Sequence, residues 1–233
     1  MSEISADAGA SRRSLIYGLY GNPMSGEAIE ARSFEIIDNE AISHGFSSGQ
    51  WEVVRRMVHT TADFELAKSV RFSSDALERG IAALKSGVPI FADSNMIRSG
   101  LSMARLRTVC PRYGPESVVC HVADAGVISQ ARGAGLPRSL FAVRKARGLL
   151  DGGIAVFGNA PVALLELNRL IVEEGVKPAI VIAMPVGFVH VAESKDELMS
   201  LEVPYIAIAG RRGGSPLAVS TVHALCTLAA KTV

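Results

Sequence analysis

Five short apolar segments, which lack any alternation of polar and apolar residues, constrain the fold of this chain most strongly. They span residues 89–92, 118–122, 154–157, 179–183 and 205–209, and helical patterns follow at 161–174, 193–199 and 216–230. Strands without alternation are buried on both faces, and strands that alternate with helices form parallel sheets. We therefore predict an α/β fold, a three-layer flavodoxin-like or Rossmann-like sheet of about five parallel strands.

The first part of the chain is predicted to add helices to this sheet. Residues 1–22 are rich in Ser, Gly and Ala, and we expect a partly flexible segment that is mobile at first and extended afterwards. Apolar residues at helical spacing predict helices that start near Ser25, cover residues 49–59, and run from 74 or 75 to 85. No internal repeat is present, so residues 23–233 are predicted to form a single domain.

The charge of the chain is balanced overall but uneven along its length. The 24 Lys and Arg residues against 23 Asp and Glu give a net charge of +1, which excludes a general nucleic-acid binder. Residues 98–147 hold two acidic and nine basic residues, and the latter are Arg98, Arg105, Arg107, Arg112, Arg132, Arg138, Arg144, Lys145 and Arg147. This basic segment either lines a pocket for a polyanion or forms a solvated face of helices.

The cysteines and the apolar runs indicate a cytoplasmic protein. Three cysteines without a CxxC pair favour reduced thiols and speak against a disulfide framework or a zinc site. The five histidines form no metal-binding motif, so we expect no metal site. No apolar run reaches the roughly 18 residues of a membrane span, and the start has no apolar signal-type stretch. We therefore expect no membrane association.

Three loops that follow predicted strands are candidate binding elements. In an open parallel sheet, ligands bind where the carboxyl ends of strands turn into helices. These loops are residues 157–161, where Asn159 is the predicted helix N-cap, 184–189, and 210–215. The last one, Gly-Arg-Arg-Gly-Gly-Ser, offers backbone N–H groups and two guanidiniums, which suit an anion. It is equally compatible with a glycine turn whose arginines point to water.

His59 is the candidate acid or base of the sequence. It lies at the end of an amphipathic helix, and Arg56, three residues earlier, shares its helix face. A histidine can donate and accept protons near neutral pH. A single histidine at a helix end is more often structural, so both interpretations stay open from the residues alone.

Taken together, these motifs resemble the precorrin-8X methylmutase family of cobalamin biosynthesis, also called precorrin isomerases or cobalt-precorrin-8 methylmutases. The similarity covers about residues 15–228, and its stretches occur in the order of the family. They are Arg32-Ser33-Phe34-Glu35-Ile36-Ile37, Arg56-Met57-Val58-His59, Phe157-Gly158-Asn159-Ala160-Pro161, Met184-Pro185-Val186-Gly187-Phe188-Val189, Ala192-Glu193-Ser194-Lys195 and Gly210-Arg211-Arg212-Gly213-Gly214-Ser215.

The resemblance implies an isomerase that moves a methyl group between adjacent carbons of ring C, giving a hydrogenobyrinate- or cobyrinate-type corrin. It implies no enzyme-bound cofactor and a homodimer. The family's proton donor or acceptor corresponds to His59. Substrate contacts correspond to Ser33 and Arg56 and, by the same resemblance, to Arg32, Thr60, Ser102, Arg138, Asn159, Gly187, Lys195, Gly213, Gly214 and Ser215.

Some positions depart from the family pattern. His190 stands where glycine is usual, His223 where asparagine is usual, and Ala125 where proline is common, which affects the exact substrate more than the family. From the basic segment we expect Arg98, Arg138 and Arg105 near a polycarboxylate pocket, and Arg144, Lys145 and Arg147 as surface charges. The alternatives are a non-catalytic corrinoid-binding or carrier protein and, from the sheet type alone, a dinucleotide- or flavin-using enzyme.

Overall fold

The computed structural model describes residues 14–231, and the chain divides into two compact units between Glu40 and Ala41. The first unit holds helices α1 (Ile16–Gly21) and α2 (Gly26–Glu40). The expectation of an extended lead-in is wrong for α1, where Tyr17 and Tyr20 meet edge to face at 5.7 Å, one helical turn apart. The rest of the predicted flexible segment, residues 1–13, lies outside the described residues.

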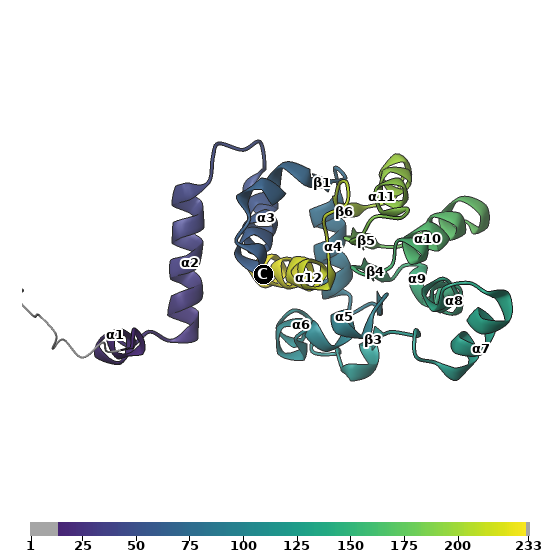
Figure 1. Ribbon diagram of the computed structural model, residues 1–233, viewed down its shortest axis with the longest axis horizontal. Helices are drawn as coiled ribbons and strands as arrows, with labels where there is room; N and C mark the ends of the chain where they lie inside the picture. The colour runs from purple at the N-terminus through teal and green to yellow at the C-terminus, as the bar shows by residue number, and fades with distance from the viewer. Residues whose placement is uncertain (1–13, 232–233) are drawn as a thin grey trace, which may run out of the picture. The chain divides into compact units, whose positions relative to one another are not determined.

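The second unit contains the sheet and the remaining helices (Figure 1). Its strands are β1 (Val70–Phe72), β2 (Ile90–Ala92), β3 (Val118–Val119), β4 (Ile154–Phe157), β5 (Ile180–Ala183) and β6 (Tyr205–Ile208). Its α-helices are α3 (Ser48–Thr61), α4 (Ala76–Lys85), α5 (Asn95–Gly100), α6 (Met103–Val109), α7 (Ala125–Ala134), α8 (Arg138–Lys145), α9 (Arg147–Leu150), α10 (Pro161–Glu174), α11 (Val191–Ser200) and α12 (Ser215–Lys231). Two 3₁₀ turns, η1 (Phe64–Ser69) and η2 (Pro115–Ser117), precede β1 and β3.

The sheet has the order β1-β6-β5-β4-β2-β3, and the predicted α/β class is confirmed. The strands β2 to β6 are parallel, and their order is the 2-1-3-4-5 order of flavodoxin-like folds when they are counted from β2. The sixth strand, β1, pairs antiparallel with β6 and was not predicted. It has three residues, and its middle residue, Arg71, is exposed, so its sequence carries no strand signal.

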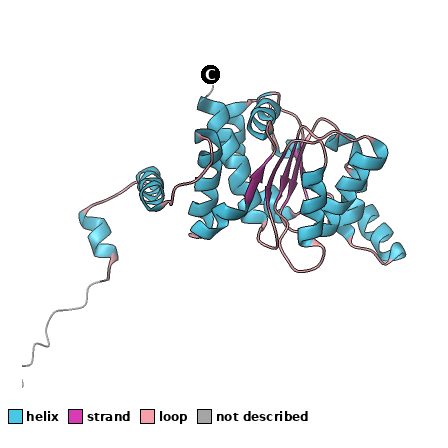
Figure 2. Cartoon of the chain, turned by 90° about the horizontal axis from the view of Figure 1, so that it is seen from above, coloured by secondary structure: helices cyan, strands magenta, loops and turns pink. Residues whose placement is uncertain are grey.

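Helices cover both faces of the sheet (Figure 2), which explains why the strand residues show no polar alternation. On one face Phe91, Phe157 and Val181 pack with residues of α8, α10 and α11 in a single apolar core. On the other face α12 packs against α4, and a Cβ atom at Gly80 of α4 would lie about 3 Å from both Ile180 and Leu225. Both surfaces of each central strand are therefore dry, as the parallel arrangement requires.

Among the described residues, no helix is both long and apolar enough to cross a membrane. The most apolar of the long helices, α12, instead buries ten of its residues against the rest of the second unit. Its apolar character is that of a core helix.

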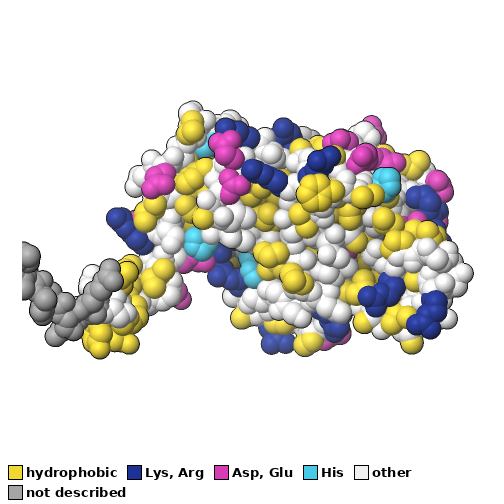
Figure 3. Space-filling model, in the orientation of Figure 1, with side chains coloured by type: hydrophobic (Ala, Val, Ile, Leu, Met, Phe, Trp, Pro, Cys, Tyr) yellow, Lys and Arg dark blue, Asp and Glu magenta, His cyan; other side chains and the backbone are white. Residues whose placement is uncertain are grey.

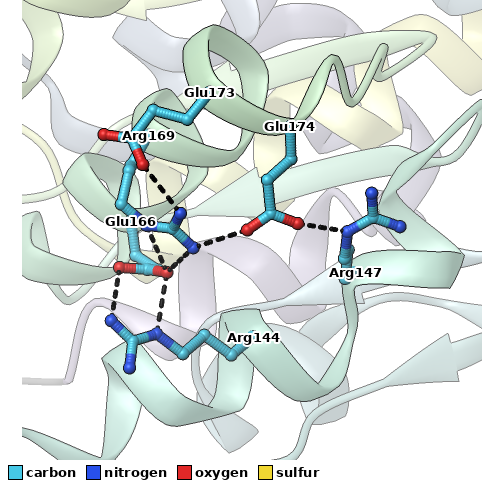
Figure 4. Close-up of polar contacts among 6 residues, drawn as sticks. All are labelled: Arg144, Arg147, Glu166, Arg169, Glu173 and Glu174. Atoms are coloured by element: carbon cyan, nitrogen blue, oxygen red, sulfur yellow. Dashed lines mark hydrogen bonds and ion pairs between the residues drawn. The ribbon is translucent and has the colours of Figure 1, made fainter.

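A network of ion pairs joins α8 and α9 to α10 (Figure 4). Its centre is Glu166, whose side chain is 4% exposed and accepts hydrogen bonds from Arg144 at 2.9 Å and Arg169 at 2.7 Å. Arg169 also reaches Glu173 and Glu174, and Glu174 in turn pairs with Arg147. Burial alone would raise the pKa of Glu166, but the hydrogen bonds from the two arginines outweigh it and lower the pKa.

Replacing Glu166 by Gln should lower the free energy of unfolding by about 1–2 kcal/mol near neutral pH, because two guanidiniums lose their charged acceptor. A carboxylate with a lowered folded-state pKa stabilises the fold above its unfolded value, and this contribution disappears as the pH falls through the folded value. The difference between wild type and E166Q should therefore shrink below pH 4.5, the ordinary value for Glu. Urea unfolding followed by circular dichroism across this range measures it. The control E173Q alters a carboxylate that is 61% exposed and should change little.

Candidate functional site

The predicted loops meet at the carboxyl edge of the parallel strands. The Gly214 N–H donates to the Met184 carbonyl at 2.8 Å, and the Gly187 N–H donates to the Arg211 carbonyl at 3.3 Å. The hydroxyl of Ser215 lies 3.1 Å from that of Ser94, the residue that caps α5. The loop of residues 210–215, which we call the 210–215 loop, is thus joined to the ends of both β5 and β2.

Asp93 occupies the point where the strand order reverses, between β2 and β4. Its side chain is 1% exposed and accepts hydrogen bonds from the backbone N–H groups of Gly158 at 3.1 Å, Asn159 at 2.8 Å and Ala160 at 2.7 Å. Burial raises the pKa of Asp93, and the three N–H bonds oppose that rise. In this class of sheet the reversal point usually receives a ligand, and here a carboxylate of the protein itself fills it.

The start of α10 differs from the prediction in one detail. Asn159 was predicted to be the N-cap, but the N-cap is Ala160, and no side chain of the local sequence caps the helix. Asp93, from the end of another strand, instead accepts the N–H groups of Asn159 and of the N-cap Ala160, and so holds the loop that leads into the helix. Sequence reasoning missed Asp93, since it follows a predicted strand but stands 67 positions before Ala160.

Two glycines allow these loops to approach each other closely. A Cβ atom at Gly158 would lie 2.7 Å from the Cα atom of Ser215, and one at Gly213 would lie 2.3 Å from the Met184 carbonyl oxygen. Neither distance is compatible with a side chain, because backbone atoms cannot move aside as the end of a side chain can. Glycine is therefore a packing requirement at both positions.

Lys195 is fully buried beneath the 210–215 loop. Its side chain is on α11, and Nζ donates to the carbonyl oxygens of Gly210 at 2.9 Å and Arg212 at 2.7 Å. Burial lowers the pKa of Lys195 to about 8. The resemblance had suggested a substrate contact, whereas the structure shows this ammonium bound to two backbone carbonyls.

The two arginines of the 210–215 loop both have partners. Arg212 forms an ion pair with Asp63 at 2.9 Å, and the Arg211 guanidinium lies 5.5 Å from the centre of the Phe188 ring. Both arginines therefore contact other side chains of the protein, and the alternative prediction that they point only to water does not describe them. Asp63 follows the end of α3, so the Arg212 pair places this end of α3 beside the loop.

His59 lies on the last turn of α3. The helix begins with a capping box between Ser47 and Gln50, and it buries Met57 and Val58 immediately before His59. It ends at Ala62, which adopts a left-handed conformation with φ 52 and donates its N–H to the Val58 carbonyl. His59 itself is exposed. A helix anchored by buried residues therefore carries an exposed histidine on its last turn, and the Asp63–Arg212 pair follows directly after this helix.

The other predicted contacts on α3 flank this imidazole. Arg56 is half-buried, and its carbonyl accepts a hydrogen bond from the Thr60 hydroxyl at 2.8 Å. Thr60 is exposed like His59. Within residues 14–231 no group of three His, Cys, Asp or Glu side chains is arranged to hold a metal ion.

Three predicted contacts lie on other parts of the chain. Ser33 and Arg32 belong to α2 in the first unit, where the Ser33 hydroxyl donates to the Ile29 carbonyl at 2.8 Å and Arg32 pairs with Glu35. Arg138 begins α8, is exposed, and lines a surface pocket together with residues of α7 and of the loop between the two helices.

Ser102 caps α6, and a histidine of α12 holds it in place. Its hydroxyl accepts the Arg105 N–H at 3.3 Å, and its own N–H donates to Nε2 of His223 at 3.0 Å. His223, where the family pattern has asparagine, therefore supplies a hydrogen-bond acceptor to the start of α6. The other departure, His190, is the N-cap of α11 and adopts a left-handed backbone with φ 58. Glycine takes that conformation without strain, which gives a physical reason for the usual residue.

The basic segment is largely used by the fold. The predicted surface charges Arg144, Lys145 and Arg147 are about half exposed and pair with Glu166, Asp124 and Glu174. Arg107 and Arg112 donate to backbone carbonyls. The expectation that Arg98, Arg105 and Arg138 lie near a polycarboxylate pocket stays a prediction.

Comparisons with known proteins agree with this arrangement. A family profile described as Precorrin-8X methylmutase matches residues 28–228. A cobalt-precorrin-8 methylmutase of Leptospira interrogans is 44% identical over 88% of this chain and 95% of its own length. A precorrin-8X methylmutase of Pseudomonas aeruginosa is 36% identical over 87% of this chain and 95% of its own. The crystal structure of a precorrin-8X methylmutase from Thermus thermophilus superposes with a TM-score of 0.81 at 46% identity, covering 88% of this chain and 97% of that one.

Replacing Asp93 by Ala should lower the free energy of unfolding by about 2–4 kcal/mol, because three backbone N–H groups lose a charged acceptor. Chemical unfolding measures the loss, and Asp196→Ala, which alters an exposed aspartate of α11, is the matched control. A stability of D93A equal to that of the control would show that water replaces the carboxylate without cost.

Proposed function

Since this chain belongs to the precorrin-8X methylmutase family, the isomerases of cobalamin biosynthesis, we propose that it converts precorrin-8X or cobalt-precorrin-8 with His59 as the proton donor or acceptor. The observation that carries the assignment is the match of residues 28–228, which includes every loop at the carboxyl edge and the end of α3. The product is a corrin of the hydrogenobyrinate or cobyrinate type.

The rearrangement requires the protein only to position the substrate and to supply and take back one proton. The methyl group leaves one carbon of ring C and bonds to its neighbour, so substrate and product contain the same atoms and no electron is gained or lost. A proton that assists the shift must therefore be returned at the end. An imidazole does both near neutral pH, and His59 is exposed on a helix whose preceding residues are buried.

The substrate is an apolar macrocycle with carboxylates at its rim. Arginines, hydroxyls and backbone N–H groups suit these carboxylates. Support comes from the loops that meet at the carboxyl edge and from the place of Arg56 three residues before His59. We assign the substrate contacts to Arg32, Ser33, Arg56, Thr60, Ser102, Arg138, Asn159, Gly187, Gly213, Gly214 and Ser215, and we assign Lys195 to the same site.

The alternatives are disfavoured by specific observations. The relatives described above are named as methylmutases, which argues against a carrier protein without activity. A dinucleotide or flavin phosphate would need the N–H groups at the strand-order reversal. Those of Gly158, Asn159 and Ala160 are bound to Asp93, whose carboxylate would repel a phosphate.

Replacing His59 by Ala should lower the rate of turnover by about 10²–10⁴-fold while binding of the substrate is retained, since only the proton-transfer group is removed. The change in the ultraviolet–visible spectrum of added precorrin-8X or cobalt-precorrin-8 follows both steps. His44→Ala, at another exposed histidine, is the control and should turn over at the wild-type rate. Wild-type turnover in H59A would refute the role of His59, and binding without conversion by the wild type would favour a carrier protein.

We also infer a homodimer in the cytoplasm. The first unit exposes large apolar side chains, which Figure 3 shows in yellow beside the grey residues, and α1 leaves Ile16 at 42%, Tyr17 at 57% and Tyr20 at 69% exposed. Such a surface on a short helix is typical of an interface with a second copy. The described cysteines are all free and buried, which fits a reducing compartment.

The dimer predicts a mass in solution twice that of one chain, as measured by sedimentation or light scattering. Replacing Tyr17 and Tyr20 together by Ser should weaken the association by at least about tenfold, because the apolar area they bury is lost. The control is the double variant E27Q/E78Q, which changes one exposed helix residue in each unit and should leave the association unchanged. A monomeric wild type would contradict the proposal.

A further inference from the structure

We propose that Lys195 is a positioning residue, which holds the 210–215 loop in the shape that receives a carboxylate of the substrate without touching the substrate itself. The observation is the pair of hydrogen bonds from Nζ to the carbonyl oxygens of Gly210 at 2.9 Å and Arg212 at 2.7 Å. The carboxylate part of this inference rests on the function proposed above, while the effect on the loop does not.

Burial excludes a direct contact in this state of the protein. The side chain of Lys195 has no exposed surface, and its ammonium already binds two acceptors inside the molecule. Burial lowers the pKa of Lys195 more than the charge of Asp196, its neighbour in sequence, raises it. A buried ammonium is costly, and here the hydrogen bonds to two backbone carbonyls offset the cost.

The two bonds also fix the direction of the peptide groups in the loop. In a trans peptide the C=O of one residue and the N–H of the next point in opposite directions, and the described residues contain no cis peptide. With the carbonyls of Gly210 and Arg212 turned toward Lys195, the N–H groups of Arg211 and Gly213 point away from it. Lys195 thus directs two N–H donors outward, next to the first turn of α12.

Other contacts hold neighbouring groups of the loop, among them the Arg211 carbonyl, which accepts the Gly187 N–H, and not the carbonyls of Gly210 and Arg212. Gly214 donates to Met184, Ser215 meets Ser94, and Arg212 pairs with Asp63 through its side chain. Without Lys195, the peptides after Gly210 and Arg212 lose the two bonds that orient them. Gly210 has a φ of 74 and Gly214 a φ of 132, and the low rotational cost of glycine lets the released loop adopt other shapes.

Hydrogen exchange of the substrate-free protein tests the effect on the loop. Lys195→Met removes the ammonium and keeps an unbranched apolar side chain, and Lys177→Met makes the same change at an exposed lysine. We expect the amides of residues 210–214 to exchange at least about tenfold faster in K195M than in K177M or wild type, with the sheet unchanged. Equal exchange in the loop, or faster exchange throughout the second unit, would overturn the proposal. Should K195M not fold, the comparison is made on Lys195→Gln, which is too short to reach both carbonyls.

Steady-state kinetics test the carboxylate part. K195M should raise KM by about tenfold and leave kcat within about threefold, because the loop binds substrate while His59 is untouched. A merely structural role would lower the active fraction and therefore kcat, with KM unchanged, and this result would overturn the positioning role. If wild type does not convert precorrin-8X or cobalt-precorrin-8, the proposed function fails, and the exchange experiment still decides whether Lys195 holds the loop.

Discussion

The carboxylate of Asp93 is the interaction on which the carboxyl edge of this sheet depends. It joins the end of β2 to the loop after β4 through three backbone N–H groups. That loop lies against the start of α12, because Gly158 meets the backbone of Ser215 with no side chain between them. From Ser215 the 210–215 loop extends over Lys195 and reaches Asp63. One buried acid thus makes the first of a series of contacts that ends at Asp63, just after the helix that carries His59.

In the second unit, the helices on one face of the sheet and the loops at its carboxyl edge are held by different kinds of interaction. The helices α8, α9 and α10 are joined by ion pairs around Glu166, and they keep one face of the sheet covered. The loops at the carboxyl edge are held instead by hydrogen bonds from their backbone groups to two buried charged side chains, the acid Asp93 and the base Lys195. Two basic residues of the basic segment, Arg144 and Arg147, take part in the ion pairs between the helices, while Arg107 and Arg112 donate to backbone carbonyls, so part of its positive charge stabilises the fold.

Sequence reasoning could predict the parts of the fold that depend on local pattern. The strand over residues 154–157 was placed at its observed bounds because all four residues are buried on both sides. The strand expected over 118–122 is shorter, Val118–Val119, because it lies at the edge of the sheet with one neighbour. The antiparallel strand around Arg71 was missed for lack of an apolar run.

The site divides in the same way. Its loops follow predicted strands and could be located from the sequence, and so could the helix that carries His59. The roles of Asp93 and Lys195 could not, because they depend on partners that folding brings together from distant positions. The composition of a loop does not reveal which of its peptide groups turn inward.

The left-handed residue Ala62 has a further consequence for α3. Successive residues of an α-helix are separated by about 100° of rotation, so the direction of the His59 side chain is counted from the fixed points at either end of the helix. The capping box at Ser47 fixes the start, and Ala62 with the Asp63–Arg212 pair fixes the end. The insertion or deletion of a single residue in between would turn the imidazole by more than a quarter of a revolution relative to one end. In this fold the length of α3 is therefore as much a chemical constraint as the identity of the histidine.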